Sequence, residues 1–176
     1  WVFKPAYSRF AAKTLIRPTA AQVRATVHPT LPQPWVVQPF VAGRQICTYS
    51  VALAGQLTAH CAYPTEWTAG QGATVAFRSI EHPASRAWVE AFVAHSQWTG
   101  QIAFDFIEYS DGRVVALECN PRATSGIHLL ATQPDFVNAY FAPNRDTIVP
   151  IPNAQAMVGG GMLFYGLPSV RNRTQL

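Results

Sequence analysis

The feature that most constrains this chain is the segment QIAFDFIEYSDGRVVALECN, residues 101–120. Aromatic and β-branched residues, which favour strands, flank an Asp-Gly pair, which favours a tight turn. The segment therefore predicts an antiparallel β-hairpin with strands over 101–109 and 113–120. A chain that contains this hairpin must build at least one antiparallel sheet.

The turn of the hairpin decides which residues face each other. A two-residue turn at Asp-Gly and a four-residue turn around it give the same pairing. In that pairing Asp105 lies opposite Glu118, and Ala103 lies opposite Asn120. A three-residue loop with a bulge would instead shift the pairing by one residue.

Two carboxylates on one face of a sheet need a compensating partner. Paired side chains have Cβ atoms roughly 4.5–5.5 Å apart, so Asp105 and Glu118 would repel each other. The same face is expected to be mostly apolar, which makes the charges poorly solvated; its apolar members are Ile107, Tyr109, Val114 and Ala116.

A divalent cation would offset this repulsion. Mg²⁺ prefers hard oxygen ligands and typically takes one or two carboxylates together with phosphate oxygens and water. Asn120 projects from the same face as Glu118 and can supply a further oxygen, and Arg122 continues the alternation. The alternative is that the two carboxylates are solvated or pair with a basic side chain, for which Arg122 and Arg78 are the candidates.

The rest of the chain predicts a mixed fold. Strands and helices do not follow βαβ order, so the class is α+β, with largely antiparallel sheets and flanking helices. The expected elements are a hairpin over 46–63, a loop over 67–72, a strand over 73–80, a helix that begins near Pro83 and ends before Gly100, and short helices over 126–132 and 135–141.

Composition excludes several classes of protein. Apolar residues make up 49% of the chain, which is too many for a disordered protein. The net charge is +4, but the arginines are scattered singly, which argues against a nucleic-acid partner. No apolar stretch approaches the ~18 residues of a membrane span.

The three cysteines have no C-x-x-C spacing, as expected for free thiols in a cytoplasmic protein. Adjacent His60 and Cys61 would point to opposite faces of a strand and are not expected to bind zinc together.

The hairpin also resembles the end of the ATP-grasp domain, as found in biotin carboxylase and the carbamoyl-phosphate synthetase large subunit. In that family an acidic residue on one strand and a Glu-x-Asn-x-Arg motif on the next hold magnesium and the phosphates of the nucleotide. The resemblance implies that Asp105, Glu118 and Asn120 hold Mg²⁺, with Mn²⁺ as a possible substitute. It implies that Arg122 is the catalytic residue, placed at the transferring phosphoryl group.

Two earlier segments are similar to the same family. VFKPAYSRF resembles the strand whose lysine, here Lys4, contacts the ATP phosphates, and Arg9 would add positive charge there. VVQPFVAGRQ resembles the hinge whose backbone binds adenine, which corresponds to Gln38–Val41.

The hinge departs from the family in two places. Gln38 stands where the family usually has Glu, and Gln45 stands where an acid usually contacts the ribose. Phe40 and Ile107 are the expected apolar contacts on either side of the purine.

The resemblance implies an organisation and an activity. Residues 1–45 would belong to the small ATP-grasp lobe and residues 46–176 to the large lobe. The implied activity is that of an ATP- and Mg²⁺-dependent ligase, which activates a small-molecule carboxylate as an acylphosphate for attack by an amine. The alternatives are a non-catalytic nucleotide-binding module and an interaction domain.

The low content of charged residues, 12%, suggests that other protein covers part of the surface. ATP-grasp enzymes usually carry another domain before this region, which commonly helps to bind the acceptor, and this sequence lacks it. The chain also opens on Trp1 rather than Met. We therefore expect a piece of a longer protein, with contacts to that domain or to a second copy of the chain.

Overall fold

The structure, a computed structural model, describes residues 1–7, 13–69, 73–142 and 146–161. The chain forms two compact units, and the first gives way to the second between Ala42 and Gly43. Within the described residues, no helix is long and apolar enough to cross a membrane. The strands pair mainly in antiparallel ladders and a few helices flank them, so the fold class is α+β, as predicted.

The first unit contains a small sheet and one helix. The strand order is β2-β1-β3, with antiparallel pairing throughout. The helix was not predicted, although the sequence carries its start signal. The Thr19 side chain accepts a hydrogen bond from the Gln22 N–H, and the Gln22 side chain accepts one from the Thr19 N–H, which is a capping box. The elements are β1 (Val2–Pro5), β2 (Leu15–Ile16), α1 (Ala20–Thr26) and β3 (Trp35–Gln38).

The second unit is built on an antiparallel sheet with the order β5-β4-β8-β9. Its first hairpin was predicted, and its tight turn uses Ala54 and Gly55, whose φ angles of 48° and 79° are both positive. Its second hairpin is the predicted one around Asp111-Gly112. The strands are β4 (Arg44–Leu53), β5 (Gln56–Pro64), β8 (Gly100–Glu108) and β9 (Val114–Asn120).

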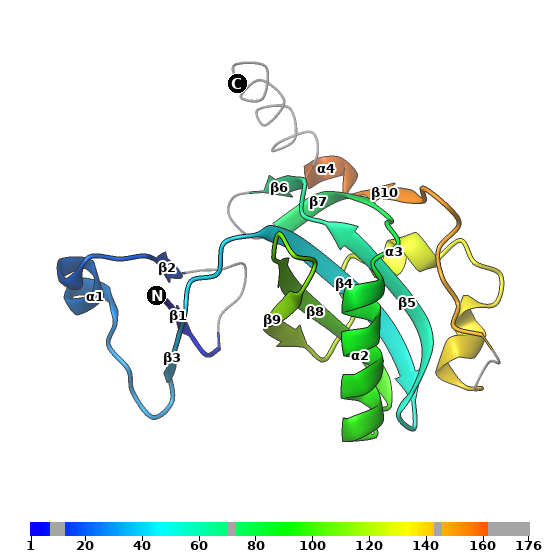
Figure 1. Ribbon diagram of the computed structural model, residues 1–176, viewed down its shortest axis with the longest axis horizontal. Helices are drawn as coiled ribbons and strands as arrows, with labels where there is room; N and C mark the ends of the chain where they lie inside the picture. The colour runs from blue at the N-terminus through cyan, green and yellow to red at the C-terminus, as the bar shows by residue number, and fades with distance from the viewer. Residues whose placement is uncertain (8–12, 70–72, 143–145, 162–176) are drawn as a thin grey trace, which may run out of the picture. The chain divides into compact units, whose positions relative to one another are not determined.

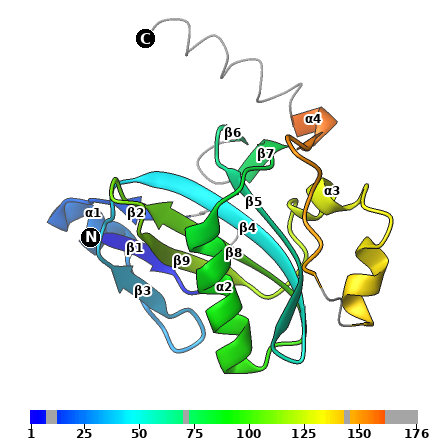
Figure 2. The ribbon, with the colours of Figure 1, turned by 45° about the vertical axis from the view of Figure 1, so that its right-hand side comes forward.

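Helix α2 (Pro83–Ser96) lies across one face of this sheet (Figures 1 and 2). Pro83 suits the first helical turn, the His82 side chain caps that turn, and Gln97 ends the helix in a left-handed conformation. Fully buried Val89 and Val93 face the sheet. Aromatic rings fill the space between helix and sheet, with centroids 5.0–5.9 Å apart; they belong to Trp88, Phe92, Phe104 and Phe106.

A second core lies on the opposite face of the same sheet. Tyr49 and Tyr63 from the sheet pack there with Leu129, Leu130 and Phe136. A second small sheet, with the order β10-β7-β6, contributes Phe77, whose ring meets the Tyr63 ring edge to face at 5.2 Å. The elements are β6 (Trp67–Ala69), β7 (Ala73–Arg78), α3 (Ile127–Leu130), the 3-10 helix η1 (Phe136–Tyr140), β10 (Gln155–Met157) and α4 (Gly159–Gly161). β6 replaces the start of the predicted 67–72 loop.

Candidate functional site

The turn between β8 and β9 is neither a two-residue nor a four-residue turn but the alternative, a three-residue loop accompanied by a bulge. The Tyr109 N–H donates to the Arg113 carbonyl at 2.8 Å, and the Gly112 N–H donates to the Tyr109 carbonyl at 3.0 Å. Three residues, 110–112, therefore form the loop, and Gly112 takes the left-handed conformation with φ 82°. This loop shifts the adjoining pairs by one residue, so Glu108 faces Val114 and Phe106 faces Ala116.

A β-bulge then restores the predicted pairing. The register shifts between Phe106 and Asp105, so that Leu117 is the extra residue on β9. Beyond it, Asp105 lies opposite Glu118 and Ala103 lies opposite Asn120, which confirms the predicted pairs.

The prediction that Val114 and Ala116 lie on the same face as the carboxylates was wrong. Because the bulge reverses the alternation on β9, Val114 and Ala116 belong to the opposite face and pack against the core beneath α2. Val115, which is paired with Ile107, takes their place beside the carboxylates.

The two carboxylates end a row that crosses the whole sheet. Tyr63 on β5 faces Cys47 on β4, Cys47 faces Asp105 on β8, and Asp105 faces Glu118 on β9. Paired residues project to the same side of a sheet. Exposure increases along the row: Cys47 is buried, Asp105 is half-buried and Glu118 is exposed. The carboxylate pair is thus open to solvent on the β9 side.

Cys47, a member of this row, and Thr65, which lies next to it, were not predicted from the sequence. The Cys47 Sγ lies 3.3 Å from the Thr65 Oγ1, and the thiol donates a hydrogen bond to the Asp105 carboxylate. Burial raises the pKa of the Cys47 thiol far above its usual range, and the charge of Asp105 raises this pKa further. The thiol therefore stays protonated and can act as a donor to Asp105. No sequence signal identifies it, because its position depends on the pairing of β4 with β8.

Asn120 and Arg122 form a small unit next to Glu118. The Arg122 Nη2 donates to the Asn120 Oδ1 at 3.0 Å, and the Arg122 N–H donates to the Asn120 carbonyl at 2.8 Å. An amide oxygen has two lone pairs, so the Asn120 Oδ1 retains acceptor capacity for a metal. Among the described residues, Glu118 forms no ion pair with Arg122, and Arg78 pairs with Glu66 instead. The structure thus lacks the basic partners proposed as the alternative for Glu118.

The donor set indicates which kind of metal it suits. No cluster of three or more His, Cys, Asp and Glu side chains suited to a metal occurs in the described part of the chain. Two carboxylates and an amide suit Mg²⁺, which keeps phosphate and water among its ligands. Zinc at His60 and Cys61 is excluded by direction: the His60 Nδ1 meets the Ser50 Oγ at 2.9 Å, whereas the Cys61 thiol donates to the Gly126 carbonyl on the other face at 3.4 Å.

Gln45 and Ile107 lie on the same face as the carboxylates. They are direct partners across β4 and β8 and lie two residues along each strand from the Cys47–Asp105 pair. Positions two residues apart on a strand project to the same face. Both side chains are half-buried. The Gln45 carbonyl accepts a hydrogen bond from the Thr65 N–H at 3.2 Å, which fixes the backbone there.

The remaining predicted residues belong to the first unit. Lys4 on β1 faces Val36 on β3. Gln38, at the end of the edge strand β3, faces Val2 on β1. The predicted adenine contacts Phe40 and Val41 follow β3 as irregular chain, and the Arg17 guanidinium lies 4.0 Å from the centroid of the Phe40 ring. Arg9 lies outside the described residues.

Comparisons with known proteins give matches at the level of structure. No protein-family model matches the chain, and no curated protein sequence matches it significantly. The N5-carboxyaminoimidazole synthase of Aspergillus clavatus, solved with ADP and 5-aminoimidazole ribonucleotide, superposes with a TM-score of 0.58 at 10% identity. The match covers 87% of this chain and 42% of that one.

Two further solved structures agree with this match. The biotin carboxylase domain of the Hydrogenobacter thermophilus 2-oxoglutarate carboxylase, solved with MgADP, gives a TM-score of 0.58 at 10% identity, over 84% of this chain and 38% of that one. The L-amino acid ligase of Bacillus licheniformis gives 0.51 at 13% identity, over 73% and 34%. This chain thus spans 34% to 42% of the lengths of the three proteins. These likenesses show that the chain has an ATP-grasp fold, as its hairpin predicted.

Proposed function

We propose that this chain is the nucleotide- and metal-binding part of an ATP-grasp ligase. The proposed reaction activates a carboxylate substrate as an acylphosphate, which an amine or similar nucleophile then attacks. The observation that carries the proposal is the pairing of Asp105 with Glu118 beside Asn120 and Arg122. Two carboxylates on adjacent strands are costly for a sheet unless a cation joins them.

The residues on this face fit Mg²⁺. Asp105 and Glu118 would provide two carboxylate ligands and the Asn120 Oδ1 an amide oxygen, and Mn²⁺ accepts the same donors. When bound, the ion would neutralise charge on the phosphates. Cys47 holds Asp105 by a hydrogen bond from its thiol, which limits the directions that the carboxylate can take.

The other residues would position the nucleotide. Arg122, held by Asn120, would place its guanidinium against the transferring phosphoryl group, where electrostatic stabilisation provides most of the catalysis. Lys4 and Arg9 would contribute positive charge at the phosphates. The backbone of Gln38–Val41 would meet the adenine.

Two further contacts would complete the nucleotide site. Gln45 would face the ribose, and Phe40 and Ile107 would lie against the purine. In this proposal residues 1–45 act as the small lobe and residues 46–176 as the large lobe.

A second candidate is a non-catalytic nucleotide-binding module. The observation that favours it is the pair of neutral amides, Gln38 and Gln45, at positions where the resemblance predicts acids. This candidate predicts that ATP binds without release of ADP across a panel of carboxylates and amines.

The substitution Glu118→Gln tests the metal site. It removes one of two opposed charges and keeps the size of the side chain. We expect the free protein to melt at the same temperature or slightly higher, because a repulsion is lost. We expect Mg·ATP to bind about tenfold more weakly, which removes about 1.4 kcal/mol of ligand-induced stabilisation. Thermal melts with and without Mg·ATP measure both effects.

Glu108→Gln is the matched control, because Glu108 lies on the same hairpin but has ion-pair partners. Its carboxylate lies 3.1 Å from the His82 Nε2 and 3.9 Å from the Arg44 Nη1. This variant should melt lower without ligand and keep the full response to Mg·ATP. The metal site is refuted if Glu118→Gln behaves in that way instead.

A further inference from the structure

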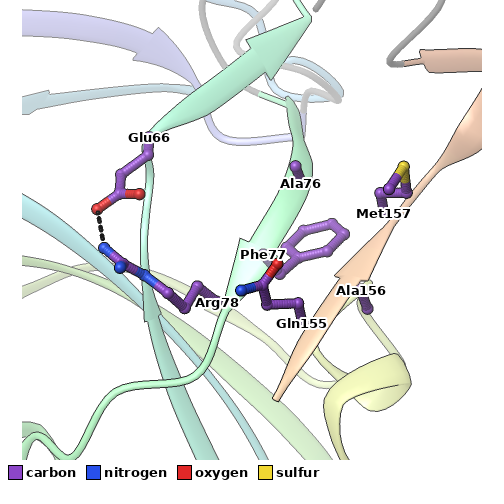
Figure 3. A pocket seen from close by; sticks show the side chains of 7 residues that line it. All are labelled: Glu66, Ala76, Phe77, Arg78, Gln155, Ala156 and Met157. Carbon is purple, nitrogen blue, oxygen red and sulfur yellow. Dashed lines mark hydrogen bonds and ion pairs between the residues drawn. The ribbon is translucent and has the colours of Figure 1, made fainter. Parts of the chain in front are cut away.

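The second unit contains an open hollow of about 470 Å³ that belongs to neither the carboxylate row nor the hinge. It lies along the β7–β10 ladder, next to the start of β6 (Figure 3). A volume of this size is sufficient for a small metabolite. Seven residues line it, and the argument uses five of them: Glu66, Ala76, Arg78, Gln155 and Met157.

Strand pairing divides the lining into a polar and an apolar part. Arg78 is the direct partner of Gln155, and Ala76 is the direct partner of Met157. Both pairs project from the same face of the ladder, because the positions are two residues apart. The polar pair and the apolar pair are therefore separated by about 7 Å along the strands.

The polar end also carries a negative charge. The Arg78 Nη2 lies 3.3 Å from the Glu66 Oε1, and Figure 3 shows this contact. The side chains are 52% and 34% exposed, and an ion pair this exposed contributes little to stability. The contact uses one nitrogen of the Arg78 guanidinium. The other N–H groups of this guanidinium can donate hydrogen bonds to the carboxylate of a ligand.

We propose that this hollow binds an aliphatic α-amino acid. The carboxylate of the ligand would meet Arg78 and the Gln155 amide, and its ammonium group would meet Glu66. Its side chain would lie over the apolar pair formed by Ala76 and Met157. A short aliphatic chain spans the ~7 Å between the polar and apolar pairs of the ladder.

This site is separate from the proposed metal site. Phe77 lies between the two pairs on β7 and projects to the other face, where its ring meets Tyr63 at 5.2 Å. Tyr63 belongs to the row that leads to Asp105. The Arg78–Gln155 and Ala76–Met157 pairs thus project away from that row, and the amino-acid site does not depend on the proposed ligase function.

Titration calorimetry of the full chain, without nucleotide or metal, tests the proposal. L-leucine should bind, and 4-methylpentanoate and isoamylamine should each bind at least fivefold more weakly, because each lacks one of the two charged groups. Glycine should also bind more weakly, because it cannot reach the apolar pair. Equal affinity for L-leucine and 4-methylpentanoate would overturn the role of Glu66, and the absence of heat with L-leucine at millimolar concentration would overturn the site.

Arg78→Met should weaken L-leucine binding at least tenfold. Arg86→Met is the matched control, because Arg86 also forms an exposed ion pair, with Glu90 at 2.8 Å, but lines no part of this hollow. That variant should bind L-leucine as the wild type does. Equal affinities in the Arg78 variant and the wild type would refute the proposal, whatever the outcome of the Mg·ATP melts.

Discussion

The two faces of the β5-β4-β8-β9 sheet differ in what fills them. The face beneath α2 is closed by aromatic rings, and Phe104 and Phe106 are almost fully buried there. On the opposite face, α3 and η1 cover residues from β4 and β5, whereas Glu118 on β9 is exposed. The same strands serve both faces, because consecutive side chains alternate.

This difference separates stability from chemistry. On β8, Phe104 and Phe106 project toward α2, and Asp105 between them projects to the other side. The rings hold the strand in place by burial, and this leaves the intervening position free to carry a charge. The strongest stability effects are therefore expected on the face under α2, and the strongest ligand effects on the other.

The largest expected effect comes from removing a ring under α2. Phe104 is 1% exposed, and its centroid lies 5.0 Å from those of both Trp88 and Phe92. Phe104→Ala should lower the free energy of unfolding by about 3–5 kcal/mol, through lost burial and the cavity left behind. Phe141→Ala, at a ring that is 80% exposed, should change it by less than about 0.5 kcal/mol. Urea unfolding of both variants measures the contrast, and similar losses would contradict the assignment of the core.

Local pattern was sufficient to predict much of this architecture. The pairing of Asp105 with Glu118 depends on one short hairpin, whose strands and turn are adjacent in sequence. Helix α2 was predicted from Pro83 and the helical spacing of its apolar residues. Helix α1 could have been predicted as well, because Thr19 and Gln22 form its capping box.

Long-range and compensating features could not be predicted in this way. Cys47 meets Asp105 only because β4 pairs with β8 at one particular offset, which is set by the packing of the whole sheet. The bulge at Leu117 cancels the register shift caused by the three-residue loop, so the predicted pairing was right although the assumed turn was wrong. The three-residue loop and the bulge cannot be recognised from the alternation of apolar and polar residues, because their effects on the Asp105–Glu118 register cancel.

A smaller effect on the α2 face concerns pH. His60 is buried beside α2, and its Nδ1 lies 2.9 Å from the Ser50 Oγ. Burial lowers the pKa of His60 to about 3, and the nearby charges of Arg86 and His82 act in the same direction. In the unfolded chain a histidine pKa is about 6.5, so the unfolded state binds more protons between these two values. Stability contributed by neutral His60 is therefore complete above about pH 6.5 and is lost as the pH falls toward 3.

The measurement is the slope of the unfolding free energy between pH 7 and pH 5. His60→Gln should flatten this slope, whatever its effect on stability at pH 7. His95→Gln, at an exposed position on α2, should leave the slope unchanged. A slope that persists after His60 is replaced would assign the acid sensitivity to another group.

The smallest expected effect tests the bulge itself, because it asks on which face two adjacent valines lie. Val114 packs against the core under α2, whereas Val115 is paired with Ile107 on the face of the carboxylates. Val114→Ala should therefore lower the free energy of unfolding by about 1 kcal/mol, as expected for a half-buried side chain that loses two methyl groups. Val115→Ala should change it by less than about 0.5 kcal/mol, but should alter the affinity for Mg·ATP if the nucleotide lies on that face. Had β9 kept a regular register from a two- or four-residue turn, the two valines would exchange faces and the order of the effects would reverse. Urea unfolding and Mg·ATP melts of the two variants distinguish these registers, because the substitutions are chemically identical and only the direction of the side chains differs.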